Sequence, residues 1–455
     1  MHFHQFLAFF RRLRASATTW FSRDEVSQQH VRHKVHEIAR MLQNEDWPRL
    51  HQQSPYILRW LATETVLRKG FQAVFWTTGP IVHIGEPVIS AGWLVTSARI
   101  PVELERAKLG MSLLLSPSGS LLSLRFAPPN LLNLGPSWTP PKYALASSIR
   151  DVQLQVGSPK TRSRGTLTLP TSPGQHPCLI MLPGSGPCDQ DSSVGCAKPF
   201  KDLASGLATL GIATLRFDKI THTHGSRSRN SDTFTLEDEY MGHARDAIDQ
   251  AFQHGCVSPT GVFVLGHSLG AYVAPRLMAE DSRIAGCIIM AGPAAPPSWS
   301  ALRQYRYLAS VDGAASETKV ENPPQIKDLQ RQCELSADPH LSLSTPRSEL
   351  PFGICAAYWR SFAGFTPIAT CVHEGRPVLV MQGVRDYQVT VEDDFVRWRD
   401  ALEGCRYAEL RVYEFLNHLF IRGEGRSLPR EYEEPGNVDE EVVGDLGQWV
   451  LRNMR

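Results

Sequence analysis

The sequence predicts a protein of the α/β class with a mostly parallel central sheet, preceded by a small α+β domain. Two patterns lead to this prediction. After residue 150, short apolar runs alternate with segments of helical periodicity, and the middle runs are continuously apolar. Strands that helices cover on both faces have such continuous runs. Before residue 136, helical patterns are followed by strands alone, which is typical of an α+β arrangement.

With 455 residues, the chain is longer than one ordinary domain. A cluster of prolines between residues 128 and 141 interrupts any helix or strand there, so this stretch is predicted to be a linker. We therefore expect four parts: an N-terminal segment (1–24), an accessory α+β domain (25–135), a linker (136–150) and a main domain (151–455).

In the accessory domain, apolar residues recur at helical spacing between residues 26 and 50, namely Val31, Val35, Ile38, Ala39 and Leu42. This pattern predicts an amphipathic helix. Short strands separated by Gly and Pro are predicted to follow it over residues 72–76, 81–84, 92–102, 109–115 and 121–126.

In the main domain, strands are predicted over residues 152–156, 165–169, 178–182, 213–217, 262–266, 287–291, 378–382 and 410–413. The helical segments between them cover residues 200–210, 238–252, 271–280 and 391–402. The alternation stops at about residues 293–377, where further helical patterns predict a cap inserted over the site. Ligands of parallel sheets bind beyond the C-terminal ends of the strands, so we expect the functional site there.

The overall charge argues against nucleic-acid partners. Lys and Arg number 47 against 46 Asp and Glu, and the net charge of +1 gives no attraction to nucleic acid or an anionic membrane. No run of about 18 apolar residues occurs, so no transmembrane segment is expected. The nine cysteines are scattered without a CxxC spacing, so neither a metal site nor a disulfide framework is predicted.

The N-terminal segment (1–24) contains a short apolar run at residues 6–10 with arginines directly behind it. This order is wrong for a secretory signal, and the run is too short. We therefore expect a cytoplasmic protein. Mitochondrial targeting or an amphipathic surface segment stays an open alternative, because no acidic residue precedes Asp24.

Residues 266–270 (GHSLG) have the G-x-S-x-G pattern. A lone match is weak, but this one follows an apolar strand and precedes a helical segment, which is the setting of a nucleophile elbow. Gly266 and Gly270 permit a sharp turn that holds Ser268 in a strained backbone conformation. Ser268 is therefore predicted to be a nucleophile, and the alternative is a structural serine in a tight turn.

A nucleophilic serine needs a histidine base, and in this setting the acid and then the histidine follow it along the chain. His418 lies behind the last predicted strand and is the predicted base. Asp386 follows the strand at 378–382 and is the predicted acid. Asp393 and Asp394 are the alternatives, at a helix start where acidic residues are common. The histidines that precede the acid are interpreted as surface or packing residues: His222, His224, His243, His254, His267 and His373.

The tetrahedral intermediate of such a reaction needs backbone N–H donors, which form an oxyanion hole. One donor is predicted at Leu269, directly after the nucleophile. The second is predicted at Ser185, in a loop where Gly184 and Gly186 allow the backbone to approach a substrate. The alternative for this loop is a simple Gly-Pro turn. Cys188 beside it is interpreted as structural.

Several stretches together resemble α/β-hydrolases of the serine-aminopeptidase-like and dienelactone-hydrolase-like kind, among them carboxylesterases with a small extra N-terminal domain. These stretches are LPGSGPCDQD (182–191), KPFKDLA (198–204), LRFDK (215–219), GHSLGAYVA (266–274) and GVRDYQVT (383–390). The resemblance covers residues 150–425 and implies the α/β-hydrolase fold and esterase-type activity without metal or organic cofactor. Residues 25–135 look like the accessory domain of that group. The sequence departs from the usual pattern at Cys188, Cys196 and Ile220, and in a charged tail at 423–435.

Three functional hypotheses follow. The first is a serine hydrolase that cleaves a carboxylic ester of a small molecule through a Ser-His-Asp triad and an acyl-enzyme. The second keeps the triad but acts on a thioester, or transfers or cyclises an acyl group, in a biosynthetic pathway such as one of secondary metabolism. The third is a non-catalytic binding protein of the same fold. The oligomeric state stays open.

Overall fold

The computed structural model describes residues 25–91, 95–116, 118–132, 134–225, 231–313 and 324–454. The N-terminal segment (1–24) lies outside the described residues. The chain forms two compact units. The described part of Met1–Trp138 belongs to the N-terminal unit, together with Val194–Cys196 and Leu428–Pro435; the rest forms the main unit. The domain boundaries stay a prediction.

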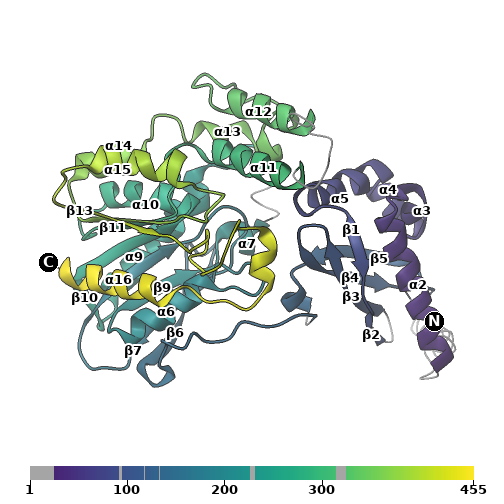
Figure 1. The fold of residues 1–455 in the computed structure, drawn as a ribbon, viewed down its shortest axis with the longest axis horizontal. Helices are drawn as coiled ribbons and strands as arrows, with labels where there is room; N and C mark the ends of the chain where they lie inside the picture. Colours follow the sequence, from purple (N-terminus) through teal and green to yellow (C-terminus); the bar gives the residue numbers. More distant parts are fainter. Residues whose placement is uncertain are drawn as a thin grey trace, which may run out of the picture. The chain divides into compact units, whose positions relative to one another are not determined.

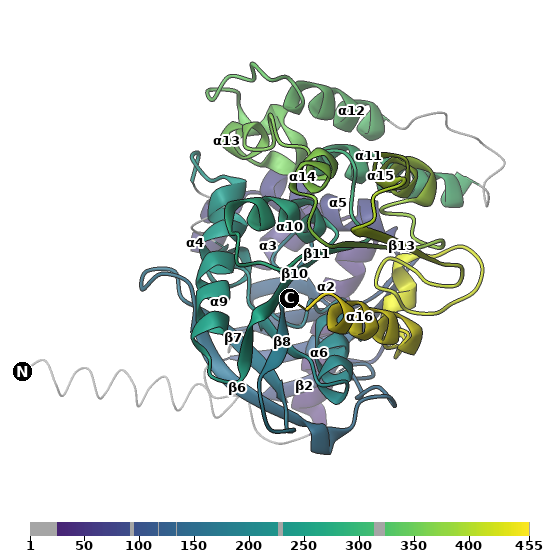
Figure 2. The ribbon, with the colours of Figure 1, turned by 90° about the vertical axis from the view of Figure 1, so that its left-hand side faces the viewer.

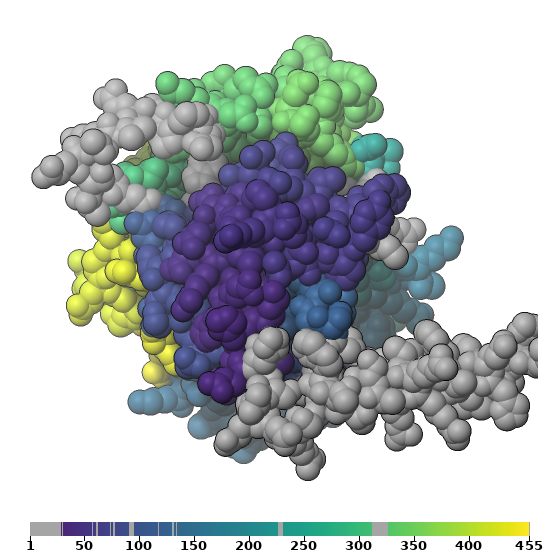
Figure 3. All heavy atoms as spheres, turned by 90° about the vertical axis from the view of Figure 1, so that its right-hand side faces the viewer, coloured from purple at the N-terminus to yellow at the C-terminus, as the bar shows by residue number. Residues whose placement is uncertain are grey.

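The N-terminal unit places helices against an antiparallel sheet (Figure 1). Its helices are α2 (Glu25–Gln43), α3 (Trp47–Gln52), α4 (Tyr56–Leu61) and α5 (Glu64–Thr78). The five strands are β1 (Ile81–Ile84), β2 (Val88–Ala91), β3 (Thr96–Leu104), β4 (Lys108–Leu115) and β5 (Leu121–Ala127). Buried residues of α2, such as Ile38 and Leu42, pack with Ile100 and Met111 of the sheet. Figure 3 shows the helical face of this unit in purple.

The strand predicted over residues 72–76 is wrong, because this stretch belongs to α5. Phe71 and Phe75 are four residues apart, so a helix places both on one face. There they lie against Trp47, with ring centroids 6.1 and 6.5 Å away, and against the edge of Phe126. In this short apolar run, tertiary contacts therefore determined that a helix forms and not a strand. The predicted strand at 92–102 begins at Thr96 in the described residues.

The main unit contains an eight-stranded sheet in the order β13-β12-β11-β10-β8-β9-β7-β6. Neighbours from β13 to β9 are parallel, and β7 and β6 are antiparallel. This confirms the prediction of a mostly parallel sheet. The strands are β6 (Ile149–Val156), β7 (Ser163–Pro170), β8 (His176–Leu182), β9 (Ala213–Phe217), β10 (Val257–His267), β11 (Cys287–Met290), β12 (Val378–Gly383) and β13 (Ala408–Tyr413).

Helices cover both faces of this sheet (Figure 2). On one side, α6 (Pro199–Thr209) and α16 (Glu440–Arg452) share a buried cluster with the strands. On the other side lie α9 (Gly242–Gln253), α10 (Leu269–Glu280), α14 (Pro367–Glu374) and α15 (Val396–Leu402). All residues of β8 and β9 are buried, as strands between two helical layers should be.

The insertion between β11 and β12 is helical, as predicted. It contains α11 (Pro297–Gly313), α12 (Pro324–Ser336), α13 (Ala356–Arg360) and α14. The last of these packs on α10, whereas α12 and α13 lie beyond α10 (Figure 1). Two π-helical turns, Glu237–Met241 and Val391–Phe395, precede α9 and α15, and a short α7 (Ile220–Thr223) follows β9. In the described ranges, no helix has the length and apolar character needed to span a membrane.

Candidate active site

Ser268 lies in the turn between the end of β10 and the start of α10. Its backbone adopts φ 54° and ψ −121°, a conformation that is costly for any residue except glycine. The turn is also tightly packed. A Cβ on Gly266 would lie 2.2 Å from the oxygen of Gly270, and one on Gly270 would lie 2.1 Å from the oxygen of Leu182. The turn therefore places Ser268 at the C-terminal end of β10, at the edge of the sheet.

Asp386 follows β12 and is only 3% exposed. One of its carboxylate oxygens accepts the backbone N–H groups of Gln388 (2.7 Å) and Val389 (3.0 Å). The other accepts Gln382 Nε2 at 3.2 Å and His418 Nδ1 at 2.7 Å. Four donors thus fix the carboxylate, and one of them is the predicted base.

His418 lies in a tight loop after β13 and is 5% exposed. The loop is stabilised by Asn417, whose side-chain oxygen accepts the N–H groups of Leu419 and Ile421. A Cβ on Gly383 would lie 2.3 Å from the oxygen of Leu416, so only glycine lets the end of β12 approach this loop. Because the Nδ1–H of His418 donates to a carboxylate, its Nε2 is left as a proton acceptor.

The alternative acids have other partners. Asp394 accepts the N–H of Ala294 at 2.9 Å and pairs with Arg303 of α11. Asp393 accepts a hydrogen bond from the Thr390 hydroxyl at 3.2 Å. The side chains of both residues therefore stabilise the start of the α15 segment and its contact with the insertion.

His267 has a contact that the sequence interpretation missed. Its Nε2–H donates to the backbone oxygen of His418 at 2.8 Å, and the two rings lie 4.6 Å apart. Burial, followed by the nearby His418, lowers the pKa of His267 to about 3. His267 thus joins the nucleophile turn to the histidine loop. In the described part of the chain, Ser268 and His418 are not themselves hydrogen-bonded.

The loop after β8 lies against the nucleophile turn. A Cβ on Gly184 would lie 3.3 Å from the Cβ of Ser268. The backbone N–H groups of Ser185 and Leu269 have no hydrogen-bond acceptor among the described residues. No acceptor among these residues therefore competes with a ligand for either group. Gly186 next to them has φ +84°, which glycine adopts without strain.

The insertion reaches the neighbourhood of the acid. Tyr307 of α11 stacks on Tyr387, the residue after Asp386, with ring centroids 4.8 Å apart. The Tyr307 hydroxyl also donates to the backbone oxygen of Ser427 at 3.1 Å. The insertion is thus in contact with the loop that holds the acid. Within the described ranges, no group of three or more His, Cys, Asp and Glu side chains is arranged to hold a metal ion.

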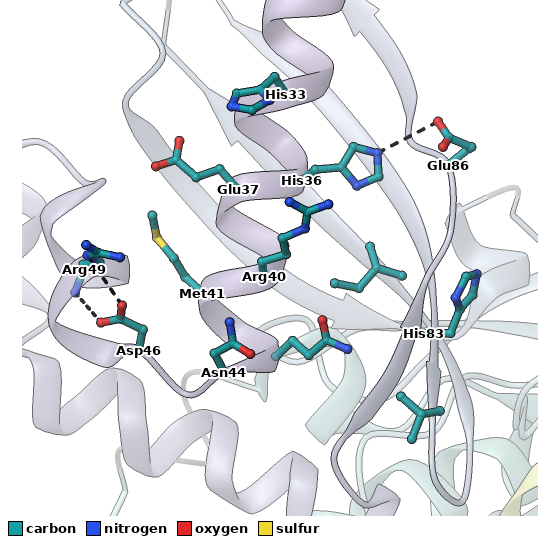
Figure 4. Close-up of a pocket in the computed structure, with 13 residues that line it drawn as sticks. His33, His36, Glu37, Arg40, Met41, Asn44, Asp46, Arg49, His83 and Glu86 are labelled. Carbon is teal, nitrogen blue, oxygen red and sulfur yellow. Dashed lines mark hydrogen bonds and ion pairs between the residues drawn. The ribbon is translucent and has the colours of Figure 1, made fainter.

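The N-terminal unit has a hollow of its own, with a volume of about 660 Å³ (Figure 4). It lies beside α2 and the strand β1, and its lining carries both signs of charge. His36 lies 3.9 Å from Glu86, and Arg49 lies 3.7 Å from Asp46. Two arginines and three carboxylates line the hollow, so neither sign of charge dominates enough to indicate a particular ligand.

Comparisons with known proteins agree with this architecture. Residues 179–428, more than half of the chain, match the family model described as "Alpha/beta hydrolase family". The chain is 34% identical over 288 residues to esterase EstD of Thermotoga maritima, and the match covers 63% of this chain. It spans 65% of that relative, just under two thirds of its length.

Two solved structures are similar over most of their own length. An esterase of Pyrococcus furiosus is 17% identical, with 70% of this chain and 98% of that chain covered and a TM-score of 0.42. Est1E from Butyrivibrio proteoclasticus is 16% identical, with 66% and 98% covered and a TM-score of 0.43.

Proposed function

We propose that this chain, which belongs to the alpha/beta hydrolase family, hydrolyses carboxylic esters of small molecules with Ser268, His418 and Asp386 as its catalytic triad. The observation that supports this most is the 2.7 Å hydrogen bond between Asp386 and His418, next to the strained turn of Ser268. The similarity to esterase EstD favours an ester over other acyl substrates.

In the first half of the reaction, the Ser268 hydroxyl attacks the ester carbonyl and its proton passes to Nε2 of His418. Asp386 holds the imidazole in the required tautomer and stabilises the imidazolium that forms. The contact between Ser268 and His418 closes when substrate binds, since catalytic hydrogen bonds are often long in free enzymes. The tetrahedral intermediate then expels the alcohol, which takes the proton from His418, and leaves an acyl group on Ser268.

In the second half, a water molecule attacks the acyl group while His418 accepts its proton. The intermediate collapses to the carboxylic acid, and the proton on His418 passes to the leaving Ser268 oxygen and regenerates its hydroxyl. In both halves, the oxyanion accepts hydrogen bonds from the backbone N–H groups of Ser185 and Leu269. Each such donor stabilises the transition state by about 3 kcal/mol in comparable sites.

The test is covalent labelling with a fluorophosphonate, followed by intact-mass measurement. We expect one label on the wild-type chain and none on Ser268→Ala. Cys188→Ala is the matched control, because this thiol lies near the Ser185 loop; it should label like the wild type. Labelling of Ser268→Ala would disprove the assignment, and an unlabelled wild type would favour a binding protein.

A panel of p-nitrophenyl esters and acyl thioesters then identifies the leaving group. We expect turnover of the esters, and loss of this turnover in Ser268→Ala. Turnover of thioesters alone, or transfer of the acyl group to an acceptor other than water, would replace the ester proposal by the biosynthetic alternative.

A further inference from the structure

A buried lysine lies directly behind the loop that carries Ser185. Lys219 follows β9, and its side chain has no exposed surface. Its amino group contacts three oxygens, each at 2.8 Å: the backbone oxygen of Gly184, the hydroxyl of Tyr240 and the Glu239 carboxylate. An ammonium group has three N–H donors, so each oxygen takes one of them.

Tyr240 adds a second donor to the same backbone. Its hydroxyl lies 2.8 Å from the oxygen of Gly184 and 3.0 Å from that of Pro183. Because it already accepts a hydrogen bond from Lys219, its own proton is directed to these carbonyl groups. Burial and the adjacent Glu239 raise the pKa of Tyr240 well above 10, which keeps the proton on the hydroxyl.

Glu239 connects this group to the insertion. Its second carboxylate oxygen accepts the hydroxyl of Tyr358, a residue of α13, at 2.6 Å. Tyr358 is itself packed against the rings of Phe234 and Phe362. The chain of contacts therefore runs from the insertion through Glu239 and Lys219 to the Gly184 carbonyl.

The direction of a carbonyl fixes the direction of the next N–H. The peptide unit is planar and trans, so the oxygen of Gly184 and the N–H of Ser185 point to opposite sides. Lys219 and Tyr240 hold the oxygen on the buried side. The N–H of Ser185 is thereby turned away from them, in a loop that lies against Ser268 at Gly184.

We propose that Lys219, Glu239, Tyr240 and Tyr358 are positioning residues that hold the Gly184–Ser185 peptide in the orientation needed to bind the oxyanion. Tyr358 makes this orientation depend on the placement of α13. This inference rests on the proposed esterase function. A buried ion pair is often no more stabilising than apolar side chains of the same volume, so a role in positioning accounts better for this arrangement than a role in stability.

The experiment compares Tyr240→Phe and Tyr358→Phe with a matched control, Tyr272→Phe. The Tyr272 hydroxyl is also buried and also donates to a backbone oxygen, that of Phe365, but it makes no hydrogen bond to residues 183–185 in the described part of the chain. The readouts are kcat and KM for a p-nitrophenyl ester, the affinity for a boronic acid transition-state analogue, and the midpoint of thermal unfolding.

We expect Tyr240→Phe to lower kcat about tenfold, less than the loss of a whole oxyanion donor, with KM changed less than twofold. Binding of the boronic acid should weaken by a similar factor. Tyr358→Phe should act in the same direction but more weakly. The control should lower the unfolding midpoint to a similar extent while kcat stays within twofold of the wild type.

A double variant, Lys219→Met with Glu239→Gln, removes the ion pair without leaving an unpaired buried charge. It should lower kcat at least as much as Tyr240→Phe does. If the tyrosine variants and the double variant keep the wild-type kcat, or lower it no more than Tyr272→Phe, the positioning role is wrong although the esterase function stands. A wild-type chain without fluorophosphonate labelling would instead remove the proposed function, and this inference with it.

Discussion

His267 donates a hydrogen bond of 2.8 Å from its side chain to the backbone oxygen of His418. The residue before the proposed nucleophile thus holds the loop of the proposed base. The two segments are far apart in the sequence, and this contact links the end of β10 to the loop after β13. The geometry leads to four predictions.

Removing the His267 donor should impair catalysis by His418 more than it lowers the stability of the fold. We expect His267→Leu to lower kcat about tenfold, since leaving a buried oxygen unsatisfied costs about 1–3 kcal/mol and the loop can relieve this cost by moving. His267→Gln keeps an N–H donor and should retain most of the activity. Steady-state kinetics of both variants test this, and equal losses in the two would contradict it.

The low pKa of His267 should make the fold sensitive to acid. The folded state holds this side chain neutral down to about pH 3, whereas the unfolded chain binds a proton below about pH 6.5. Its effect on stability is therefore absent above pH 6.5, and stability is lost as the pH falls from there towards 3. Over this range the free energy of unfolding falls by up to about 1.4 kcal/mol per pH unit.

Denaturant unfolding at pH 7 and pH 5 measures this effect. The loss of stability between these two pH values should be smaller in His267→Gln than in the wild type, because glutamine does not titrate. Other buried histidines, such as His243, contribute equally to both proteins and cancel in the comparison. If both proteins lose the same stability between pH 7 and pH 5, His267 is already protonated in the folded state at pH 5 without a loss of stability.

Asp386→Asn should separate the proposed acid from its alternatives. The amide can no longer hold His418 in the tautomer that leaves Nε2 free, so kcat should fall by about 10³–10⁴. Asp393→Asn is the control, since its carboxylate accepts a hydrogen bond from Thr390 and pairs with Arg303, and it should stay near wild-type activity. If the two variants exchange these outcomes, the acid is misassigned.

Glycine substitutions should distinguish a close approach from an ordinary helix position. Gly383→Ala places a methyl group 2.3 Å from the oxygen of Leu416 and should destabilise the fold by more than about 2 kcal/mol, with loss of activity. Gly444→Ala in α16 meets no atom within 4 Å and should be neutral or stabilising, because alanine favours helices. Chemical unfolding of both variants provides the measurement.

The sequence alone was informative where a signal is local or follows chain order. The continuous apolar runs predicted the mostly parallel sheet, and the G-x-S-x-G setting predicted the strand-turn-helix around Ser268. The order of serine, acid and histidine selected Asp386 and His418, which the structure brings within 2.7 Å of each other.

Sequence reasoning failed or was silent where a residue acts through distant partners. Residues 72–76 form a helix because Phe71 and Phe75 meet Trp47 and Phe126, and a five-residue apolar pattern carries no sign of that contact. The same holds for His267, interpreted as a surface or packing residue, and for Lys219 and Glu239, whose pairing links β9 to the turn before α9. Local periodicity thus determined the elements and their order, whereas only tertiary packing decided which buried polar groups satisfy each other, because such partners are chosen by proximity in space and not along the chain.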